Sequence, residues 1–400
     1  MTGKFRVGVY GTWRGAYLAR LFSQHDDVEI VAGCDFDESR LDIFTTRFPK
    51  ARRVHHYDEF LAEGFDILIL ASYCPNHGPE AVKALRAGKH VFSEVTAFHT
   101  LADGVALVEA VEQTGKKYML AENYCYFRDT LEMQRLCKEG LLGEFLYGEC
   151  EYVHDCRRLM VRNPDGSYHW RMWLPTFYYN THALGPILQI TGGRPVSVIG
   201  QAVENKMPRS PNPSDFGASL VRLDNGGLVR VLISFSAVRE PMSVWYCLYG
   251  TKGEVESGRW RTSYLGGEVH LYQEDDSLAE YDRTYMPTFP LRGEEAARAG
   301  HGGGDFFTVF YFLEALRRNT DPPIDVYRAC DFTLPGILAY RSSVEGGECL
   351  EVPDFRDPAV RDRYRGDHFR CPRDEAVRKD QQPTEGYEEW NRAVRRTVLQ

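Results

Sequence analysis

The sequence predicts an α/β protein built from an N-terminal doubly wound parallel sheet and a C-terminal α+β domain with an open, largely antiparallel sheet. Three observations lead to this prediction. The first third of the chain alternates short apolar strand patterns with helix patterns, and repeated units of this kind form parallel sheets with right-handed crossovers. After Asn123 the pattern changes to long, alternating, aromatic-rich strands. At 400 residues, the chain also exceeds what one ordinary hydrophobic core supports.

The first domain is expected to span residues 1–123. Its strands are expected at residues 5–10, 28–35, 65–72, 90–95 and 117–122. The third of these strands is apolar on both faces, as a central parallel strand must be. Helices are expected between them at residues 17–22, 38–48, 79–87 and 100–115. Thr100 and Asp103 have the spacing of a capping box at the start of the last helix, and Gly115 ends it.

The second domain is expected to span residues 124–354. A helix at 128–139 leads into strands that are expected at residues 144–155, 196–204, 216–223, 228–237, 242–249 and 268–273. Asp224-Asn225-Gly226-Gly227 is a strong hairpin signal between two of them. Two amphipathic helices, at 305–317 and 325–342, are expected to close this domain. Residues 355–400 are rich in charge and proline, and we expect them to form a charged arm.

Composition narrows the class of protein. The net charge of −9 argues against nucleic acid or an anionic membrane as the main partner. No apolar run is long enough to cross a bilayer, and the N-terminus reads directly as a first strand, so a cytoplasmic enzyme is expected. The ten cysteines are scattered without C-x-x-C spacing, so neither a disulfide framework nor a metal site is expected.

The turn between the first strand and the first helix carries the main binding signal, Gly11-Thr12-Trp13-Arg14-Gly15. Glycine permits a tight turn there, and the backbone N–H groups and helix dipole attract a pyrophosphate. Asp35 ends the second strand, where a carboxylate would accept hydrogen bonds from the adenosine ribose and repel the extra phosphate of NADP. We therefore expect a Rossmann domain that binds NAD, with Arg40 close enough to affect the choice between NAD and NADP.

The glycine pattern departs from the usual motif because Trp13 stands where a second glycine would fall. The loop alone would also suit a flavodoxin-like domain that binds no dinucleotide. The strand–helix alternation and Asp35 together favour the NAD interpretation.

Two further segments are Ala71-Ser72-Tyr73-Cys74-Pro75-Asn76-His77 and Ala87-Gly88-Lys89-His90-Val91-Phe92-Ser93-Glu94. They resemble the Gfo/Idh/MocA oxidoreductase family. Tyr249-Gly250-Thr251-Lys252-Gly253 and Ile324-Asp325 extend the resemblance into the second domain. The resemblance implies NAD or NADP, sugar-like or polyol substrates, and dimers or tetramers that pack through the C-terminal sheet. It also assigns Ser72, Asn76, His77 and Glu94 to cofactor binding.

Two departures from that family point to a subgroup. The usual E-K-P is Glu94-Val95-Thr96 here, so the lysine beside the reacting hydroxyl is absent. In the usual D-x-x-x-H, His182 remains but Tyr178 replaces the aspartate. Four further segments follow in order: Glu122-Asn123-Tyr124-Cys125-Tyr126, Tyr152-Val153-His154-Asp155, Tyr179-Asn180-Thr181-His182-Ala183-Leu184-Gly185-Pro186 and His301-Gly302-Gly303-Gly304-Asp305. With the two departures, they resemble the NAD-dependent glycosidases typified by α-N-acetylgalactosaminidases.

The subgroup implies transient oxidation at sugar C3, elimination of the group on C1, addition of water and re-reduction, so that NAD is not consumed. We assign His182 as the main acid/base and Tyr179 as its partner, because they are three apart at the opening of a helix that Pro186 would help start. Glu122, Tyr152, Tyr178 and His301 are expected to bind the substrate.

Each of these residues also has a purely structural interpretation. His182 could be a cap or core histidine, Tyr152 could be sheet packing, and Asp305 could cap the helix after a flexible His301 linker. Two other functions stay open: an ordinary NAD(P)-dependent sugar or polyol dehydrogenase, and a non-catalytic NAD-binding sensor. Loss of the lysine at Val95 counts against the dehydrogenase, and retention of His182 with Tyr179 counts against the sensor.

Overall fold

The structure of the chain is a computed structural model that describes residues 4–160, 169–207, 210, 212, 214–259, 267–274 and 280–371. The chain divides into two compact units, neither of which is continuous in sequence. Unit 1 comprises Met1–Tyr126, Arg292–Asp331 and Asp354–His368, and unit 2 comprises Phe127–Leu291, Phe332–Pro353 and Phe369–Gln400.

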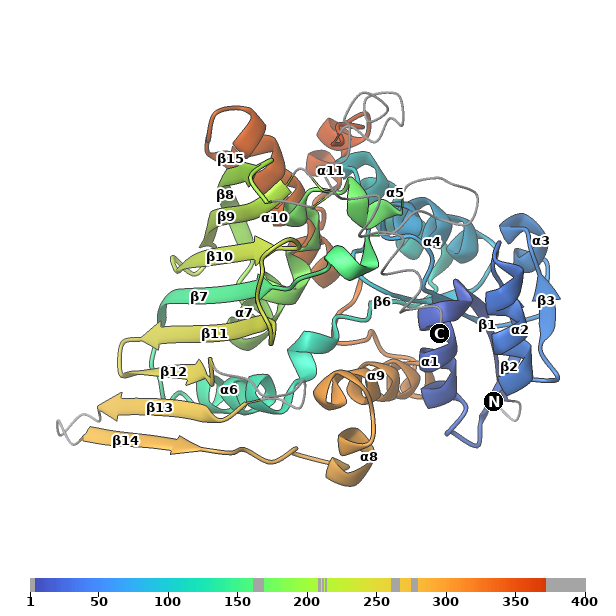
Figure 1. Cartoon of the computed structure of the whole chain (residues 1–400), viewed down its shortest axis with the longest axis horizontal. Helices are drawn as coiled ribbons and strands as arrows, with labels where there is room; N and C mark the ends of the chain where they lie inside the picture. The colour runs from blue at the N-terminus through green and yellow to red at the C-terminus, as the bar shows by residue number, and fades with distance from the viewer. Residues whose placement is uncertain are drawn as a thin grey trace. The chain divides into compact units, whose positions relative to one another are not determined.

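Unit 1 contains a six-stranded parallel sheet in the order β3-β2-β1-β4-β5-β6 (Figure 1). The strands are β1 Phe5–Tyr10, β2 Val28–Cys34, β3 Arg52–Val54, β4 Ile67–Leu70, β5 His90–Ser93 and β6 Tyr118–Leu120. The helices along the first part of the chain are α1 Thr12–Phe22, α2 Glu38–Arg47, α3 Tyr57–Leu61, α4 His77–Arg86 and α5 Leu101–Thr114. The doubly wound parallel sheet is confirmed, and the capping box of Thr100 and Asp103 is present at α5. The short edge strand β3 was not predicted, because only one of its three side chains is buried.

Later segments of the chain also belong to unit 1. They are α8 Gly293–Ala297, α9 Gly304–Arg318 and α11 Pro358–Tyr364. Phe312 of α9 packs against Phe22 of α1 at 6.3 Å and against Phe92 of β5 at 5.4 Å between ring centroids. The first of the two closing helices expected in the second domain therefore lies in unit 1, because its aromatic face packs on the core beside α1.

Part of the expected charged arm is ordered on unit 1. Arg361 of α11 is only 5% exposed, and its guanidinium donates to both Glu112 carboxylate oxygens at 2.7 and 2.9 Å. It also donates to the Phe355 carbonyl oxygen at 3.2 Å. A charged side chain of this segment therefore makes a buried ion pair that holds the segment on unit 1, which the composition alone does not predict. The rest of the arm, residues 372–400, lies outside the described residues.

Unit 2 contains a nine-stranded sheet in the order β14-β13-β12-β11-β7-β10-β9-β8-β15 (Figure 1). The strands are β7 Phe145–Val153, β8 Pro195–Glu204, β9 Ser214–Leu223, β10 Leu228–Ser234, β11 Ser243–Gly250, β12 Gly253–Ser257, β13 Val269–Glu274, β14 Glu280–Tyr285 and β15 Leu350–Glu351. The predicted hairpin joins β9 to β10, and the pair β7–β10 is parallel in an otherwise antiparallel sheet. The prediction of an open, largely antiparallel sheet is confirmed.

One face of this sheet is covered by helices. They are α6 Arg128–Lys138, α7 Thr181–Thr191 and the part of α10 (Val326–Val344) that belongs to unit 2. Ser342 of α10, for example, accepts a hydrogen bond from the Gly200 backbone nitrogen of β8 at 3.0 Å. On the other face, Ile199, Val203 and Leu220 are 37%, 48% and 43% exposed. This second face is therefore open in the single chain.

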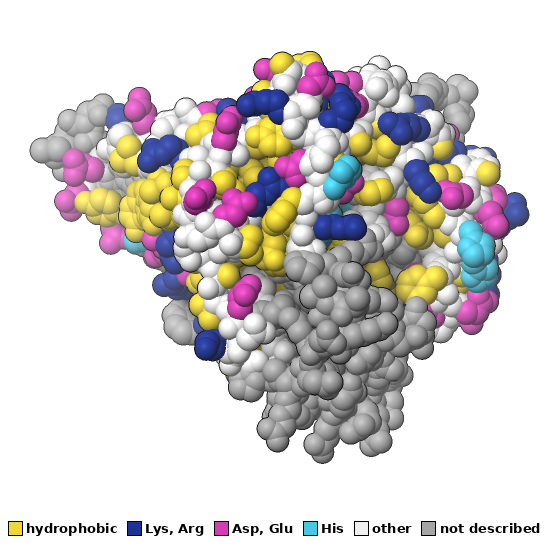
Figure 2. All heavy atoms as spheres, turned by 90° about the horizontal axis from the view of Figure 1, so that it is seen from above, with side chains coloured by type: hydrophobic (Ala, Val, Ile, Leu, Met, Phe, Trp, Pro, Cys, Tyr) yellow, Lys and Arg dark blue, Asp and Glu magenta, His cyan; other side chains and the backbone are white. Residues whose placement is uncertain are grey.

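The surface in view in Figure 2 carries basic and acidic side chains that alternate over the described residues, without a broad field of one sign. The described residues on this face therefore form no basic patch that could bind nucleic acid, in agreement with the net charge of −9. Among the helices of the described residues, none is long and apolar enough to span a membrane.

Protonation of His90 is expected to weaken unit 1 at mildly acidic pH. Burial lowers the pKa of His90 to about 4, and its Nδ1 accepts a hydrogen bond from the Lys117 backbone nitrogen at 3.0 Å. An unfolded chain binds the same proton with a pKa of about 6.5. Between about pH 6.5 and about pH 4 the unfolded chain therefore binds the proton more strongly than the folded chain. The free energy of unfolding decreases as the pH is lowered through this range.

His90→Asn keeps an acceptor near the Nδ1 position but cannot be protonated. Urea midpoints at pH 7 and pH 4.5 should differ less for His90→Asn than for the wild type. His368→Asn, at an exposed histidine, should leave the wild-type difference unchanged. An equal acid loss in His90→Asn and the wild type would contradict the assignment.

Candidate functional site

The turn between β1 and α1 has the geometry of a dinucleotide loop. Gly11 has a φ of +83°, and a Cβ there would lie 2.2 Å from the Ala71 carbonyl oxygen. A Cβ at Gly15 would lie 2.5 Å from Val9 Cγ1, so α1 packs closely on the strand only because this residue is glycine. The first turn of α1 carries no acidic residue and Gly11 offers no capping side chain, so a pyrophosphate meets positive helix-dipole potential there. These features fit NAD.

Asp35 anchors this turn from the end of β2. It is 2% exposed, and its Oδ2 accepts hydrogen bonds from the Thr12 backbone nitrogen at 2.8 Å and from Thr12 Oγ1 at 3.0 Å. Its Oδ1 accepts one from the Asp37 nitrogen at 3.1 Å. The carboxylate thus ties the start of α1 to β2. Its predicted contact with the adenosine ribose stays a prediction.

Trp13 and Arg40 lie together beside the turn. Trp13 belongs to the first turn of α1 and is 62% exposed, with the Arg40 guanidinium 5.0 Å from its ring. The break in the glycine pattern is tolerated because Trp13 points outward from the helix surface. An exposed aromatic ring beside a guanidinium can stack on a planar base, which keeps both residues as predicted cofactor contacts.

His77 joins the loops that follow β4 and β5. It is 1% exposed, its Nδ1 lies 2.9 Å from the Thr96 carbonyl oxygen, and its Nε2 lies 3.2 Å from the Ser72 carbonyl oxygen. Burial lowers the pKa of His77, so the neutral ring is favoured. The Ser72 hydroxyl donates to Glu80, and Asn76 lies at the start of α4. His77 and Ser72 thereby shape the carboxyl edge of the parallel sheet.

Arg14 is the centre of a charged network at the same turn. Its Nε donates to Glu94 Oε1 at 2.7 Å, and its two terminal nitrogens donate to the Asp305 carboxylate at 2.9 and 2.6 Å. Asp305 also accepts from Asn123 Nδ2 at 2.8 Å and lies 2.8 Å from His301 Nδ1. The network joins α1, the loop after β5, the segment after β6 and the start of α9.

Asp305 stays ionised despite its burial. Burial alone would raise the pKa of this carboxyl, but the adjacent Arg14 guanidinium and the His301 imidazole hold it well below its usual range. Gly303 is the N-cap of α9, so the interpretation of Asp305 as a helix cap is wrong. Its carboxylate instead orders the His301 segment against the glycine turn. Glu122, two residues after β6, is completely buried and accepts a hydrogen bond from the Tyr124 nitrogen at 3.2 Å.

The predicted acid/base residues lie together in unit 2. Tyr179 ends a 3₁₀ turn, His182 lies in the first turn of α7, and Tyr152 lies on β7. The Tyr179 and His182 rings are 4.9 Å apart, and Tyr152 lies 5.0 Å from His182 and 5.9 Å from Tyr179. Trp170 and Phe235 pack on Tyr179 at 5.6 and 5.2 Å. An imidazole and two phenols are therefore held in one aromatic cluster.

Two residues hold the backbone of His182: Pro186, which the sequence analysis named, and Tyr246, which it did not. Pro186 lies inside α7 rather than at its start, so the prediction that it opens the helix is wrong. Proline has no N–H, so it cannot donate to the carbonyl oxygen four residues earlier, which is that of His182. The Tyr246 hydroxyl donates to that oxygen at 2.6 Å instead. A side chain from β11 thus replaces the missing helix bond.

Other predicted residues lie apart from this cluster or beside it. Tyr178 is 2% exposed, its hydroxyl accepts from the Cys371 nitrogen at 3.3 Å, and its ring packs on Tyr340 at 5.7 Å. Its role in substrate binding stays a prediction. His154, from the same matching segment as Tyr152, lies 2.9 Å from the Tyr152 hydroxyl through its Nδ1.

Removing the Asp305 charge is expected to destabilise unit 1. Asp305→Asn leaves Arg14 without its bidentate partner, and breaking a buried ion pair costs about 3 kcal/mol. The change in free energy of unfolding can be measured by urea titration, together with a rise in the Kd for NAD measured by calorimetry. Arg135→Gln is the matched control, because Arg135 also binds two carboxylates but is 46% exposed, and it should cost less than about 1 kcal/mol. Similar losses in both variants would contradict this account.

Tyr246→Phe tests the support of His182. The buried His182 carbonyl oxygen then loses its donor, at a cost of about 1–3 kcal/mol in the free energy of unfolding. A second change, Pro186→Ala, restores an N–H that can donate to the same oxygen, and the double variant should recover part of the loss. Double-mutant unfolding curves give the coupling. Additive effects would show that the two sites do not share this carbonyl.

Comparisons with known families agree with the two units. Residues 5–122 match the Gfo/Idh/MocA family model described as an oxidoreductase family with an NAD-binding Rossmann fold. Residues 212–361 match the model of the C-terminal domain of glycosyl hydrolase 109. The first match confirms NAD as the expected cofactor.

Individual relatives cover most of the chain. An alpha-N-acetylgalactosaminidase from Tannerella forsythia is 30% identical over 345 residues, which is 73% of this chain and 71% of that protein. A glycosyl hydrolase family 109 protein from Stenotrophomonas maltophilia is 27% identical over 418 residues, covering 90% of this chain and 91% of that protein.

Solved structures share the fold. Levoglucosan dehydrogenase in complex with NADH and levoglucosan superposes with a TM-score of 0.74 at 17% identity, covering 88% of this chain and 100% of that chain. An oxidoreductase from Agrobacterium radiobacter in complex with NAD⁺, L-tartaric acid and magnesium gives a TM-score of 0.70 at 15% identity, covering 87% of this chain and 98% of that chain.

Proposed function

Because this chain belongs to the family that joins a Gfo/Idh/MocA NAD-binding domain to a glycosyl hydrolase 109 C-terminal domain, we propose that it is a redox-assisted glycosidase. The chain is an NAD-dependent enzyme. The proposal adds that it acts on a sugar glycoside by transient oxidation at C3, elimination of the group on C1, addition of water and re-reduction. The observation that carries it is the cluster of His182, Tyr179 and Tyr152 in unit 2.

Gly11, Thr12, Arg14 and Gly15 would hold NAD, which supplies reversible oxidation of a sugar hydroxyl to a ketone. The neighbouring C2 proton is acidified in the oxidised sugar, and His182 takes that proton onto its imidazole. The C1–O bond then breaks, and the leaving oxygen takes a proton from a water molecule. The hydroxide of that water adds to C1, and the proton on the imidazole returns to C2. Tyr179 acts with His182 by donating or accepting at a sugar hydroxyl.

The loop after β5 supports a mechanism without lysine. Val95 and Thr96 occupy the positions after Glu94, and they are 3% and 1% exposed. A buried valine cannot exchange a proton with a hydroxyl, so proton transfer falls to His182 and Tyr179. This assignment disfavours net dehydrogenation by a lysine-dependent route.

We also infer that two chains associate through the open face of the unit 2 sheet in the cytoplasm. Ile199, Val203 and Leu220 expose apolar surface on adjacent strands there, and contiguous patches of this kind mark interfaces. Dimers and tetramers that pack through this sheet would cover the patch.

The proposal is tested by incubating the protein with nitrophenyl α- and β-glycosides in D₂O, with and without NAD⁺. We expect NAD-dependent release of nitrophenol and deuterium at C2 of the sugar product, because the C2 proton exchanges with solvent through His182. Net NADH accumulation without release would instead indicate an ordinary sugar dehydrogenase. Neither outcome, with NAD still bound, would indicate a sensor.

His182→Gln and Tyr179→Phe should each lower kcat by about 100- to 10,000-fold, the usual contribution of a positioned acid or base. His55→Gln and Tyr147→Phe are matched controls, because His55 is exposed in unit 1 and Tyr147 donates to Glu149 on the open sheet face. If His182→Gln keeps wild-type kcat and C2 exchange, His182 is not the base.

A further inference from the structure

A cluster of mixed donor side chains lies on the open face of the unit 2 sheet, outside the site described above. In the antiparallel register, Glu256 of β12 lies opposite Cys247 of β11 on one side and His270 of β13 on the other. Glu254 is two residues earlier on β12, so its side chain shares the same face. Tyr246, the residue before Cys247, points to α7 on the covered face, which places Cys247 on the opposite one.

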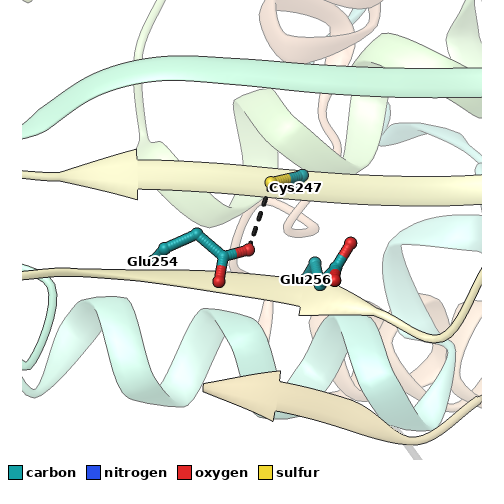
Figure 3. A group of neighbouring side chains, drawn as sticks. All are labelled: Cys247, Glu254 and Glu256. Carbon is teal, nitrogen blue, oxygen red and sulfur yellow. Dashed lines mark hydrogen bonds between the residues drawn. The ribbon is translucent and has the colours of Figure 1, made fainter. Parts of the chain in front are cut away.

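The donor atoms converge. Figure 3 shows Cys247 of β11 joined to Glu254 of β12, with Glu256 beside them on β12. One donor atom from each of the three lies within 4.8 Å of the others. Cys247 Sγ lies 3.2 Å from Glu254 Oε1. His270 Nδ1 lies 3.5 Å from Glu254 Oε2 and 4.0 Å from Glu256 Oε1. In a tetrahedral zinc site with bonds of about 2.0–2.3 Å, neighbouring donors lie about 3.5 Å apart.

We propose that Cys247, Glu254 and Glu256 bind one divalent transition-metal ion, with zinc as the best-suited element and the neighbouring His270 imidazole as the fourth ligand once its ring turns toward the ion. One thiolate, two carboxylates and this imidazole would make a four-coordinate set, and this mixture of donors selects zinc over calcium or magnesium. A site with four protein ligands leaves no open position for a reactant. The ion therefore has a structural role and ties β11, β12 and β13 together.

Surrounding side chains orient the ligands as in known metal sites. The second ring nitrogen of His270, Nε2, lies 2.8 Å from Asp282 Oδ1 on β14, and metal-bound histidines usually present their other nitrogen to a carboxylate. Trp245 Nε1 donates to Glu256 Oε2 at 2.9 Å. Both ligands are thus fixed by residues outside the cluster.

The charge of the cluster calls for a cation. On this face, Arg230 and Arg259 pair with Glu149 and Glu151. Among the residues that the structure describes, the ion pairs of Glu254 and Glu256 are with His270.

No sequence motif with closely spaced ligands predicts this site, because its residues lie on three strands that only the pairing of the sheet brings together. The expectation of no metal rested on the absence of C-x-x-C spacing among the cysteines, and a site whose ligands lie on three strands has no such spacing.

The test uses the full chain, stripped with a chelator and titrated with Co²⁺ and then Zn²⁺. We expect one cobalt per chain, a cobalt–thiolate charge-transfer band, loss of that band when Zn²⁺ is added, and a higher Tm with Zn²⁺. Cys247→Ser should abolish the band, while Cys349→Ser, at an exposed cysteine elsewhere, should keep it. Asp282→Asn should weaken cobalt binding by about 10- to 100-fold, the usual effect of losing a partner of a metal-bound histidine.

His270→Gln gives an independent readout, because His270 is partly exposed and its loss should spare the fold while removing tight binding. Circular dichroism confirms folding of each variant. Absence of a thiolate band in the wild type, or a band and affinity that survive in both Cys247→Ser and His270→Gln, would overturn the proposal.

Discussion

The buried Asp305 carboxylate is the interaction on which the cofactor end of unit 1 depends. Four groups converge on it: two guanidinium nitrogens of Arg14, the Asn123 amide and the His301 imidazole. An ionised carboxylate this deeply buried is tolerated only because it is fully paired. The pairing joins segments far apart in sequence, since Arg14 follows the first strand and Asp305 begins α9. The glycine turn is therefore held by a residue that comes almost three hundred positions later.

A second constraint acts on the acid/base cluster of unit 2. Pro186 removes a helix bond just where α7 presents His182, and Tyr246 supplies the missing donor from β11. The helix is thereby attached to the sheet through the backbone of the residue that is proposed to move protons. With a residue other than proline at position 186, the backbone N–H could donate to the His182 carbonyl oxygen within α7. The Tyr246 hydroxyl of β11 would then no longer be needed as the donor. Proline in a helix interior is costly, so its presence indicates that the attachment matters.

Local patterns predict much of this chain, and long-range pairing explains what they miss. The parallel sheet, the hairpin of β9 and β10 and the capping box of α5 were predicted because each depends on neighbouring residues. The placement of α9 and α11 in unit 1 was not, since it depends on Phe312 and Arg361 finding partners distant in sequence. The grouping of Tyr152, Tyr179 and His182 was predicted from a resemblance. The roles of Arg14, Asp305 and Tyr246 were not, because a side chain's type does not reveal its partner.

The alternation of a β-strand connects the two proposals. Successive side chains of β11 point to opposite faces, so Tyr246 reaches His182 on the covered face while Cys247 joins the donor cluster on the open face. β12 and β13 extend the sheet beyond β11, and both contact α6. An ion held by Cys247, Glu256 and His270 would bind these three strands into one rigid unit. The strand that fixes His182 would then be stiffened from its opposite face, without any metal near the reacting sugar.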